Sequence, residues 1–449
     1  TLKEIEKNIK SKIAEKLSKY ESPKSGIQDA RWYYLAPLLF DGAGYVTTWL
    51  ESGDSLSAYD EDDEKTRKQK GFLTHLETLK ALYRETNNGR NVNLGRKPDD
   101  LIEVLTDMAL ASPAVCIYRT YKNYARRFAN YLPSQIAKLF LNRMNSPEAT
   151  AIVKLAAGKK NDDAHWENLL TYCKYGNIQA MFDEYAHLIT NGLDNDEHLI
   201  DRLHYTIVDS MNVRTTSYNI DTLNNFKARV NGKKEKAVSL RTHFAVAFTK
   251  GDGKEKDADR KKTVRNSFNS PFRPFVLAST SIGQEGLDFH NYCRRIVHWN
   301  LPSNPIDLEQ REGRINRFEC LAIRQNVAKR YGNIEFNKII WSELFEKAVK
   351  EEKIENGHTS DLIPFWGLTE KEGMLKIERI VPMYPFSRDE IAYERLIKIL
   401  SLYRLTLGQA RQEELLEYIF NNCDNPEDMK DLFINLSPYY KTLGGGTNG

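Results

Sequence analysis

The sequence is poor in the patterns that identify metal-binding, disulfide-bonded and membrane proteins. Its five cysteines are scattered without a Cys-x-x-Cys pair, and its nine histidines show no metal-ligand spacing. These gaps argue against a zinc ribbon or a dithiol redox motif, so we expect no metal site. No apolar run approaches the ~20 residues that a membrane-spanning helix needs. We therefore expect a cytoplasmic protein with reduced thiols and no membrane partner.

An excess of one charge is also missing, because 65 Lys and Arg residues are balanced by 62 Asp and Glu residues. A global positive field therefore gives no argument for nucleic-acid binding, and any basic surface must be local. No Gly-x-x-x-x-Gly-Lys-Ser/Thr sequence occurs, which excludes a phosphate-binding loop of that kind in these residues. The sequence begins with Thr1 rather than methionine, which suggests a fragment or a processed polypeptide.

Helical periodicity dominates both ends of the chain. Apolar residues recur at helical spacing in the segments 2–20, 73–85 and 100–110, which is typical of helices that bury one face. We predict a mostly helical accessory region over 1–235. A helical C-terminal extension is predicted over 336–449, where the terminal GGGTNG forms a flexible tail.

The middle of the chain, 236–335, has a different pattern. Short β-like runs at 243–248, 275–279 and 296–299 alternate there with helical segments. Strands that alternate with helices indicate βαβ units and a parallel sheet covered by helices on both faces. The fold class predicted for the chain is therefore α/β.

A loop rich in small and polar residues follows the predicted strand 275–279. Ligands of open parallel sheets bind beyond the carboxyl ends of the strands, which is where this loop lies. Gly286 permits close approach of the backbone to a phosphate chain. Asp288 is placed to accept a hydrogen bond from a ribose hydroxyl or to orient an arginine. Three hydroxyl donors begin the loop: Ser279, Thr280 and Ser281.

The next motif is a predicted helix that starts at the Asn-Pro pair 304–305. Gln310, Arg314 and Arg317 follow at spacings of four and three, which predicts that they share one helical face. Gly313 in mid-helix costs ~1 kcal/mol relative to alanine, so we expect it to serve a close approach. Two arginines and a glutamine on one face suit the equatorial oxygens of a transferring phosphoryl group.

These two stretches resemble motifs V and VI of the superfamily 2 helicases and translocases. Within that superfamily they are most similar to the Swi/Snf-like group, especially the bacterial RapA-type ATPases. The sequence that usually ends motif VI in the group, Arg-Ile-Gly-Gln, is replaced by residues 317–320, Arg-Phe-Glu-Cys, which leaves the subgroup open. The motif VI signature is matched by Leu301, Pro302, Asn304, Pro305, Leu308, Glu309, Gln310, Arg311, Gly313, Arg314 and Arg317.

The resemblance implies a role for each motif residue. Arg314 and Arg317 would be arginine fingers, and Gln310 would contact the γ-phosphate region. Residues implied to border the nucleotide are Gly286, Asp288 and Gly313. Residues implied to contact the nucleic-acid backbone are Ser279, Thr280 and Ser281.

The resemblance also implies a fold and an activity. The domain 236–335 would be the second RecA-like domain of an ATP-dependent helicase or translocase that acts on double-stranded DNA. ATP and Mg²⁺ would be held mostly by an N-terminal RecA-like domain outside this sequence, so the chain alone would be inactive. Separately from the resemblance, we expect region 1–235 to bind protein partners. Two alternatives stay open: a non-catalytic helicase-like scaffold that binds proteins, and one half of an RNA helicase.

Overall fold

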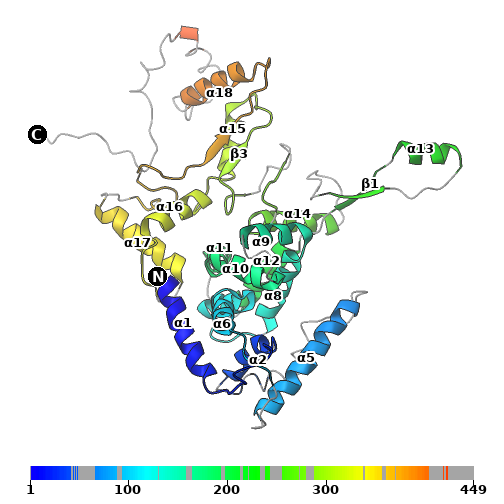
Figure 1. Ribbon diagram of the computed structural model, residues 1–449. Helices are drawn as coiled ribbons and strands as arrows, with labels where there is room; N and C mark the ends of the chain where they lie inside the picture. The colour runs from blue at the N-terminus through cyan, green and yellow to red at the C-terminus, as the bar shows by residue number, and fades with distance from the viewer. Residues whose placement is uncertain are drawn as a thin grey trace, which may run out of the picture. The chain divides into compact units, whose positions relative to one another are not determined.

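The computed structural model is drawn in Figure 1, and by its internal contacts the chain divides into two units. We call Thr1–Met211 the helical unit and Asn212–Gly449 the C-terminal unit. The sequence predicts a domain change at 235/236, and that domain assignment stays a prediction. The residues that the structure describes are 2–41, 66–87, 94–129, 131–157, 164–193, 198–212, 216–220, 222–232, 238–242, 255–272, 274–279, 288–336, 339–355, 360–369 and 371–403, with residues 44, 46, 48, 418, 421 and 422.

The described part of the helical unit consists of helices and the segments between them. One apolar cluster gathers buried residues of the first helices, including Leu17, Leu35 and Leu82. A leucine that is fully buried in this way contributes roughly 1.5–3 kcal/mol. The helices are α1 Leu2–Leu17, α2 Trp32–Leu39, α5 Thr66–Asn87, α6 Leu101–Ala111, α7 Pro113–Tyr124, α8 Tyr131–Met144, α9 Pro147–Ala157, α10 His165–Tyr175, α11 Ile178–Thr190 and α12 Leu199–Met211.

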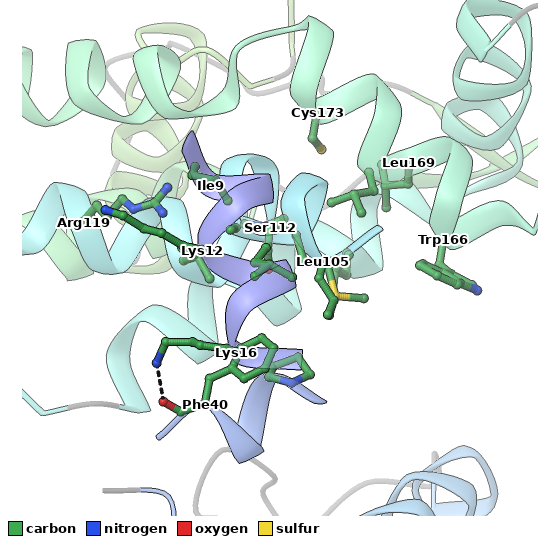
Figure 2. Close-up of a pocket in the computed structure, with 18 residues that line it drawn as sticks. Ile9, Lys12, Lys16, Phe40, Leu105, Ser112, Arg119, Trp166, Leu169 and Cys173 are labelled. Atoms are coloured by element: carbon green, nitrogen blue, oxygen red, sulfur yellow. Dashed lines mark hydrogen bonds between the residues drawn. The ribbon is translucent and has the colours of Figure 1, made fainter. Parts of the chain in front are cut away.

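The helical unit also contains a cavity of about 650 Å³ (Figure 2). Side chains of α1, α6, α7 and α10 line it, and most of them are apolar. Lys12, Lys16 and Arg119 add positive charge to the lining. The Lys16 ammonium donates a hydrogen bond to the carbonyl oxygen of Phe40 at 3.1 Å. No described residue of the two motifs lines this cavity.

The C-terminal unit mixes helices with short strands. Strands β1 and β2 form an antiparallel pair, and strands β3 and β4 form a parallel pair. In the second pair, Ile296 lies opposite Arg379 and Val297 lies opposite Ile380. The elements are β1 Thr216–Ile220, α13 Leu223–Val230, β2 Val238–Thr242, α14 Glu255–Phe268, β3 Arg295–Val297, α15 Pro305–Gly313, α16 Leu321–Tyr331, α17 Ile340–Glu355, β4 Glu378–Ile380 and α18 Asp389–Tyr403.

One strand prediction is wrong, and two short strands were not predicted. Residues 275–279 form no strand, and Phe275 and Val276 are exposed rather than buried. An apolar run becomes a strand only where another strand supplies its hydrogen bonds, and the described residues supply none here. Strands β1 and β4 lie in regions predicted to be helical. β4 has only three residues, too few to show a periodicity.

The described residues are mostly helical and include a parallel two-stranded sheet. This arrangement is compatible with the predicted α/β class. The predicted run 243–248 and the GGGTNG tail lie outside the described residues. The full RecA-like sheet with helices on both faces therefore stays a prediction.

Candidate functional site

Helix α15 carries the second motif, and its start agrees with the sequence. Asn304 is the N-cap, and its side-chain oxygen accepts a hydrogen bond from the backbone N–H of Ile306 at 2.9 Å. Pro305 occupies the first helical position, where its missing N–H costs nothing. Leu308 is completely buried and anchors the helix. The predicted Asn-Pro helix start is confirmed.

The end of α15 differs from the prediction. The helix ends at Gly313, Arg314 is its C-cap, and Arg317 lies beyond it. The carbonyl of Glu312 accepts from the N–H groups of both Ile315 and Asn316, which closes a turn instead of continuing the helix. Ile315 is then buried in a small apolar cluster. Gln310, Arg314 and Arg317 therefore do not share one face of a continuous helix.

Gly313 is consequently the last residue of the helix rather than a mid-helix residue. A Cβ atom built at Gly313 would meet no described atom within 4 Å. The expected close approach at this position is thus not present among the described residues. The low helix propensity of glycine is consistent with its place at the helix end.

The structure brings Asp288 of the first motif to Arg317 of the second. Their side chains form an ion pair at 3.1 Å, and they are 50% and 41% exposed, respectively. An exposed pair of this kind contributes only about 0–1 kcal/mol, so phosphate oxygens can replace the carboxylate at little cost. The Nε atom of Arg317 is buried and has no hydrogen-bond partner among the described residues. Of the two roles predicted for Asp288, this geometry favours orientation of an arginine.

Arg314 is fixed by a hydrogen bond to its backbone, whereas no described residue binds its side chain. Its carbonyl oxygen accepts a hydrogen bond from the backbone N–H of Phe289 at 2.9 Å, which joins the two motifs directly. Its guanidinium is half-buried, and within the described part of the chain it forms neither a hydrogen bond nor an ion pair. A fixed backbone with an unengaged guanidinium is suited to an anion that arrives from outside.

The remaining predicted residues are only partly described. Gln310 is exposed on α15, and Ser279 is exposed in the segment before the loop. Three predicted residues lie outside the described residues: Thr280, Ser281 and Gly286. The predicted nucleic-acid contacts therefore stay predictions.

His290 is close enough to the ion pair of Asp288 and Arg317 to interact electrostatically with both side chains. Its carbonyl oxygen accepts from the backbone N–H of Leu321 at 3.0 Å, which ties the first motif to the start of α16. Burial lowers the pKa of His290, which the charge of Asp288 only partly offsets. The imidazole is therefore neutral at neutral pH and adds no positive charge beside the two arginines.

Sequence reasoning missed one polar group next to these arginines. Glu312 lies two residues before Arg314, and its carboxylate is bound by Arg379 and His298. Burial raises the pKa of Glu312, but the hydrogen bonds from His298 and Arg379 outweigh it and lower that pKa to about 2. A carboxylate between an arginine and a glycine in the motif was visible in the sequence. Its partner Arg379, on the distant strand β4, was not.

The described site does not contain the ligand set of a magnesium ion. In the part of the chain that the structure describes, no group of three His, Cys, Asp or Glu side chains is arranged to hold a metal. The carboxylate of Asp288, which belongs to the first motif, forms an ion pair with Arg317 and not a metal site. Arg314 and Arg317 are donors only, so they suit phosphate oxygens and not a cation.

Among the described residues, no single helix is long and apolar enough to cross a bilayer. The adjacent helices α6 and α7 reach such a length and hydropathy only together, as a pair bent by 41°.

Comparisons with known proteins agree with the class of domain that the two motifs indicate. Residues 208–319 match the family described as helicase conserved C-terminal domain. Over 137 residues the chain is 28% identical to an uncharacterized ATP-dependent helicase, YqhH, of Bacillus subtilis (strain 168). That alignment covers 27% of this chain and 24% of the relative. No solved structure matches. Residues 208–319 are therefore similar to a helicase C-terminal domain.

Proposed function

We propose that this chain is the C-terminal motor half of an ATP-dependent helicase or translocase of superfamily 2, in the Swi/Snf-like, RapA-type group. The observation that carries the proposal is the guanidinium of Arg314, which no described residue binds, close in sequence to the Asp288–Arg317 pair at the junction of the two motifs. The helicase C-terminal match over 208–319 and the printed name of the Bacillus subtilis relative support it.

In this proposal the site is completed by an N-terminal RecA-like domain that binds ATP together with Mg²⁺. On closure, Arg314 and Arg317 act as arginine fingers on the γ-phosphate, and Gln310 contacts the same region. Arg317 exchanges Asp288 for phosphate oxygens as the site closes. An arginine finger accelerates hydrolysis by on the order of 10³–10⁵. Because the arginines reach ATP only when the two RecA-like domains close around it, this closure controls hydrolysis. Gly286 and Gly313 border the nucleotide.

The proposed track is double-stranded DNA. Ser279, Thr280 and Ser281 would donate hydrogen bonds to backbone phosphates, and each closing cycle would move the motor along the duplex. Such contacts to backbone phosphates do not depend on the base sequence and could also form with RNA. The experiment therefore compares DNA with RNA. Duplex DNA should stimulate ATP hydrolysis by the polypeptide that contains both motor halves more than single-stranded or duplex RNA does. Stronger stimulation by RNA would replace the DNA track with the RNA alternative.

The finger assignment is tested by Arg314→Ala in the polypeptide that contains both motor halves. Turnover of ATP should fall roughly tenfold or more while ATP binding stays within a few-fold, because the contact forms mainly in the transition state. The matched control is Arg395→Ala, which removes an exposed arginine from α18. Equal turnover for the two variants would remove Arg314 from the mechanism.

A second experiment separates the motor from the scaffold alternative. This chain by itself should show no robust DNA-stimulated ATP hydrolysis, since it has no phosphate-binding loop of the Gly-Lys-Ser/Thr kind. Adding the N-terminal half should restore hydrolysis. If the polypeptide with both halves stays inactive with every nucleic acid, the non-catalytic scaffold that binds proteins through 1–235 becomes the better account.

A further inference from the structure

The carboxylate of Glu312 is the meeting point of the arginine-bearing helix and the C-terminal part of the chain. The Arg379 guanidinium donates from Nη2 to Oε2 at 2.7 Å and from Nε to Oε1. His298 Nε2 lies 3.3 Å from Oε1 on the same carboxylate. The three side chains are 20% (Glu312), 25% (Arg379) and 0% (His298) exposed. The two-point Arg379–Glu312 contact fixes orientation as well as distance.

Arg379 is itself fixed by the sheet and by the last described helix. It lies in β4 opposite Ile296 of β3. The backbone N–H of His298 donates to the carbonyl of Ile380 at 2.9 Å, which extends the strand pairing by one residue. Arg379 Nη1 also lies 3.3 Å from the hydroxyl of Tyr393 in α18. Helix α18 packs against α15 (Figure 1).

The peptide between Glu312 and Arg314 is therefore held from two sides. Arg379 and His298 hold the Glu312 side chain, and the N–H of Phe289 holds the Arg314 carbonyl two residues later. The regular helix ends within this peptide, and the turn that follows is closed by hydrogen bonds from the N–H groups of Ile315 and Asn316 to the Glu312 carbonyl. The two anchors act together with this turn to fix the peptide, and among the described residues the Arg314 guanidinium has no partner.

We propose that Arg379 is a positioning residue that acts through Glu312 to aim Arg314, which makes the segment 378–403 part of the nucleotide-responsive site. This inference rests on the proposed motor function. A shift of β4 or α18 would turn the end of α15 and move the Arg314 guanidinium, and the reverse coupling follows from the same contact. A misplacement of about 1 Å can cost on the order of a hundredfold in rate.

The first test compares kcat with KM in the polypeptide that contains both motor halves. Arg379→Gln should lower kcat roughly tenfold with the KM for ATP within about threefold, because it spoils aim rather than binding. The matched control is Arg295→Gln, which breaks the neighbouring β3–β4 ion pair with Glu378 at 2.6 Å without touching Glu312. Wild-type kcat for Arg379→Gln would overturn the proposal, as would an equal loss in the control.

The second test asks whether Arg379 acts through Arg314. The double variant Arg314→Ala with Arg379→Gln should be no slower than Arg314→Ala alone, because the arginine to be aimed is already missing. A purely structural role predicts that the two losses multiply, and that result would overturn the proposal. Arg379→Lys should recover only part of the rate, since lysine keeps the charge but not the two-point contact.

A second variant keeps the test valid if Arg379→Gln does not fold. Glu312→Gln removes the same ion pair, preserves the size of the side chain and should show the same loss of kcat. If Arg314→Ala itself leaves turnover unchanged, the motor function fails. If only Arg314→Ala lowers turnover, the motor function stands and the positioning role of Arg379 is wrong.

Discussion

The core of the helical unit and the candidate site of the C-terminal unit are stabilised in different ways. In the helical unit, large apolar side chains of many helices form the core, and Leu35, Ile117 and Leu203 are completely buried. The apolar cluster at the candidate site has three buried members among the described residues, and the ion pair of Glu312 with Arg379 supplements it. A larger cluster of the C-terminal unit has ten buried members around α16 and α17, and the ion pair of Glu352 with Arg330 lies beside it. The comparison indicates that the candidate site depends on charge for its own structure more than the helical core does.

The largest expected effect is at Glu352, which is completely buried on α17. Its carboxylate accepts from Arg330 at 2.7 Å, Tyr331 at 2.8 Å and Thr369 at 2.5 Å. Glu352→Ala leaves the mostly buried Arg330 without its counter-charge and should cost about 3–5 kcal/mol in unfolding free energy. Hydrogen exchange over 321–369 measures it. Glu351→Ala, which removes an exposed i,i+4 pair with Lys347, is the control.

The next effect tests the apolar side of the comparison. Leu203→Ala should destabilise the helical unit by about 2–5 kcal/mol through the cavity that it leaves. The loss should be the same at pH 4 and pH 7, since no titrating group is removed. Urea unfolding followed by hydrogen exchange over 199–211 measures it, and Leu155→Ala, at an 82% exposed leucine, is the control. A strongly pH-dependent loss would contradict the apolar account.

An intermediate effect is the acid sensitivity of the C-terminal unit. The folded pKa of Glu312 is lowered to about 2, below its ordinary value of 4.5. Its contribution to stability is therefore present above pH 4.5 and is lost as the pH falls toward 2. The shift corresponds to on the order of 3 kcal/mol. Glu312→Gln should flatten the pH dependence in this window when exchange over 305–320 is followed. An unchanged slope would mean that the contact with Arg379 is weak in solution.

The smallest expected effect is at the rim of the candidate site. Asp288→Asn should change the unfolding free energy by less than about 1 kcal/mol, because the Asp288–Arg317 pair is exposed. Turnover in the polypeptide that contains both motor halves should change more than stability does, since Arg317 loses its orienting partner. A large loss of stability with normal turnover would assign this ion pair to the fold and not to the site.

The sequence predicted the local features of the site well. Helix α15 starts at the predicted Asn-Pro pair, because capping and proline preferences act within three residues. The end of that helix was predicted wrongly. The turn at Arg314 depends on the burial of Ile315 in a cluster with Phe289 and on a hydrogen bond from the N–H of Phe289 to the Arg314 carbonyl. Phe289 is distant from this helix in the sequence.

The sequence by itself determined which residue types the site contains. These are a glycine and an aspartate in the loop after 275–279, and a glutamine and two arginines around the end of helix α15. These types follow from chemistry, because phosphate oxygens require donors and a close backbone approach requires glycine. Only the tertiary structure decided that Asp288 holds Arg317, that no described side chain binds Arg314, and that Arg379 reaches Glu312. Such pairings arise from packing between segments far apart in the chain, and no periodicity within a segment encodes them.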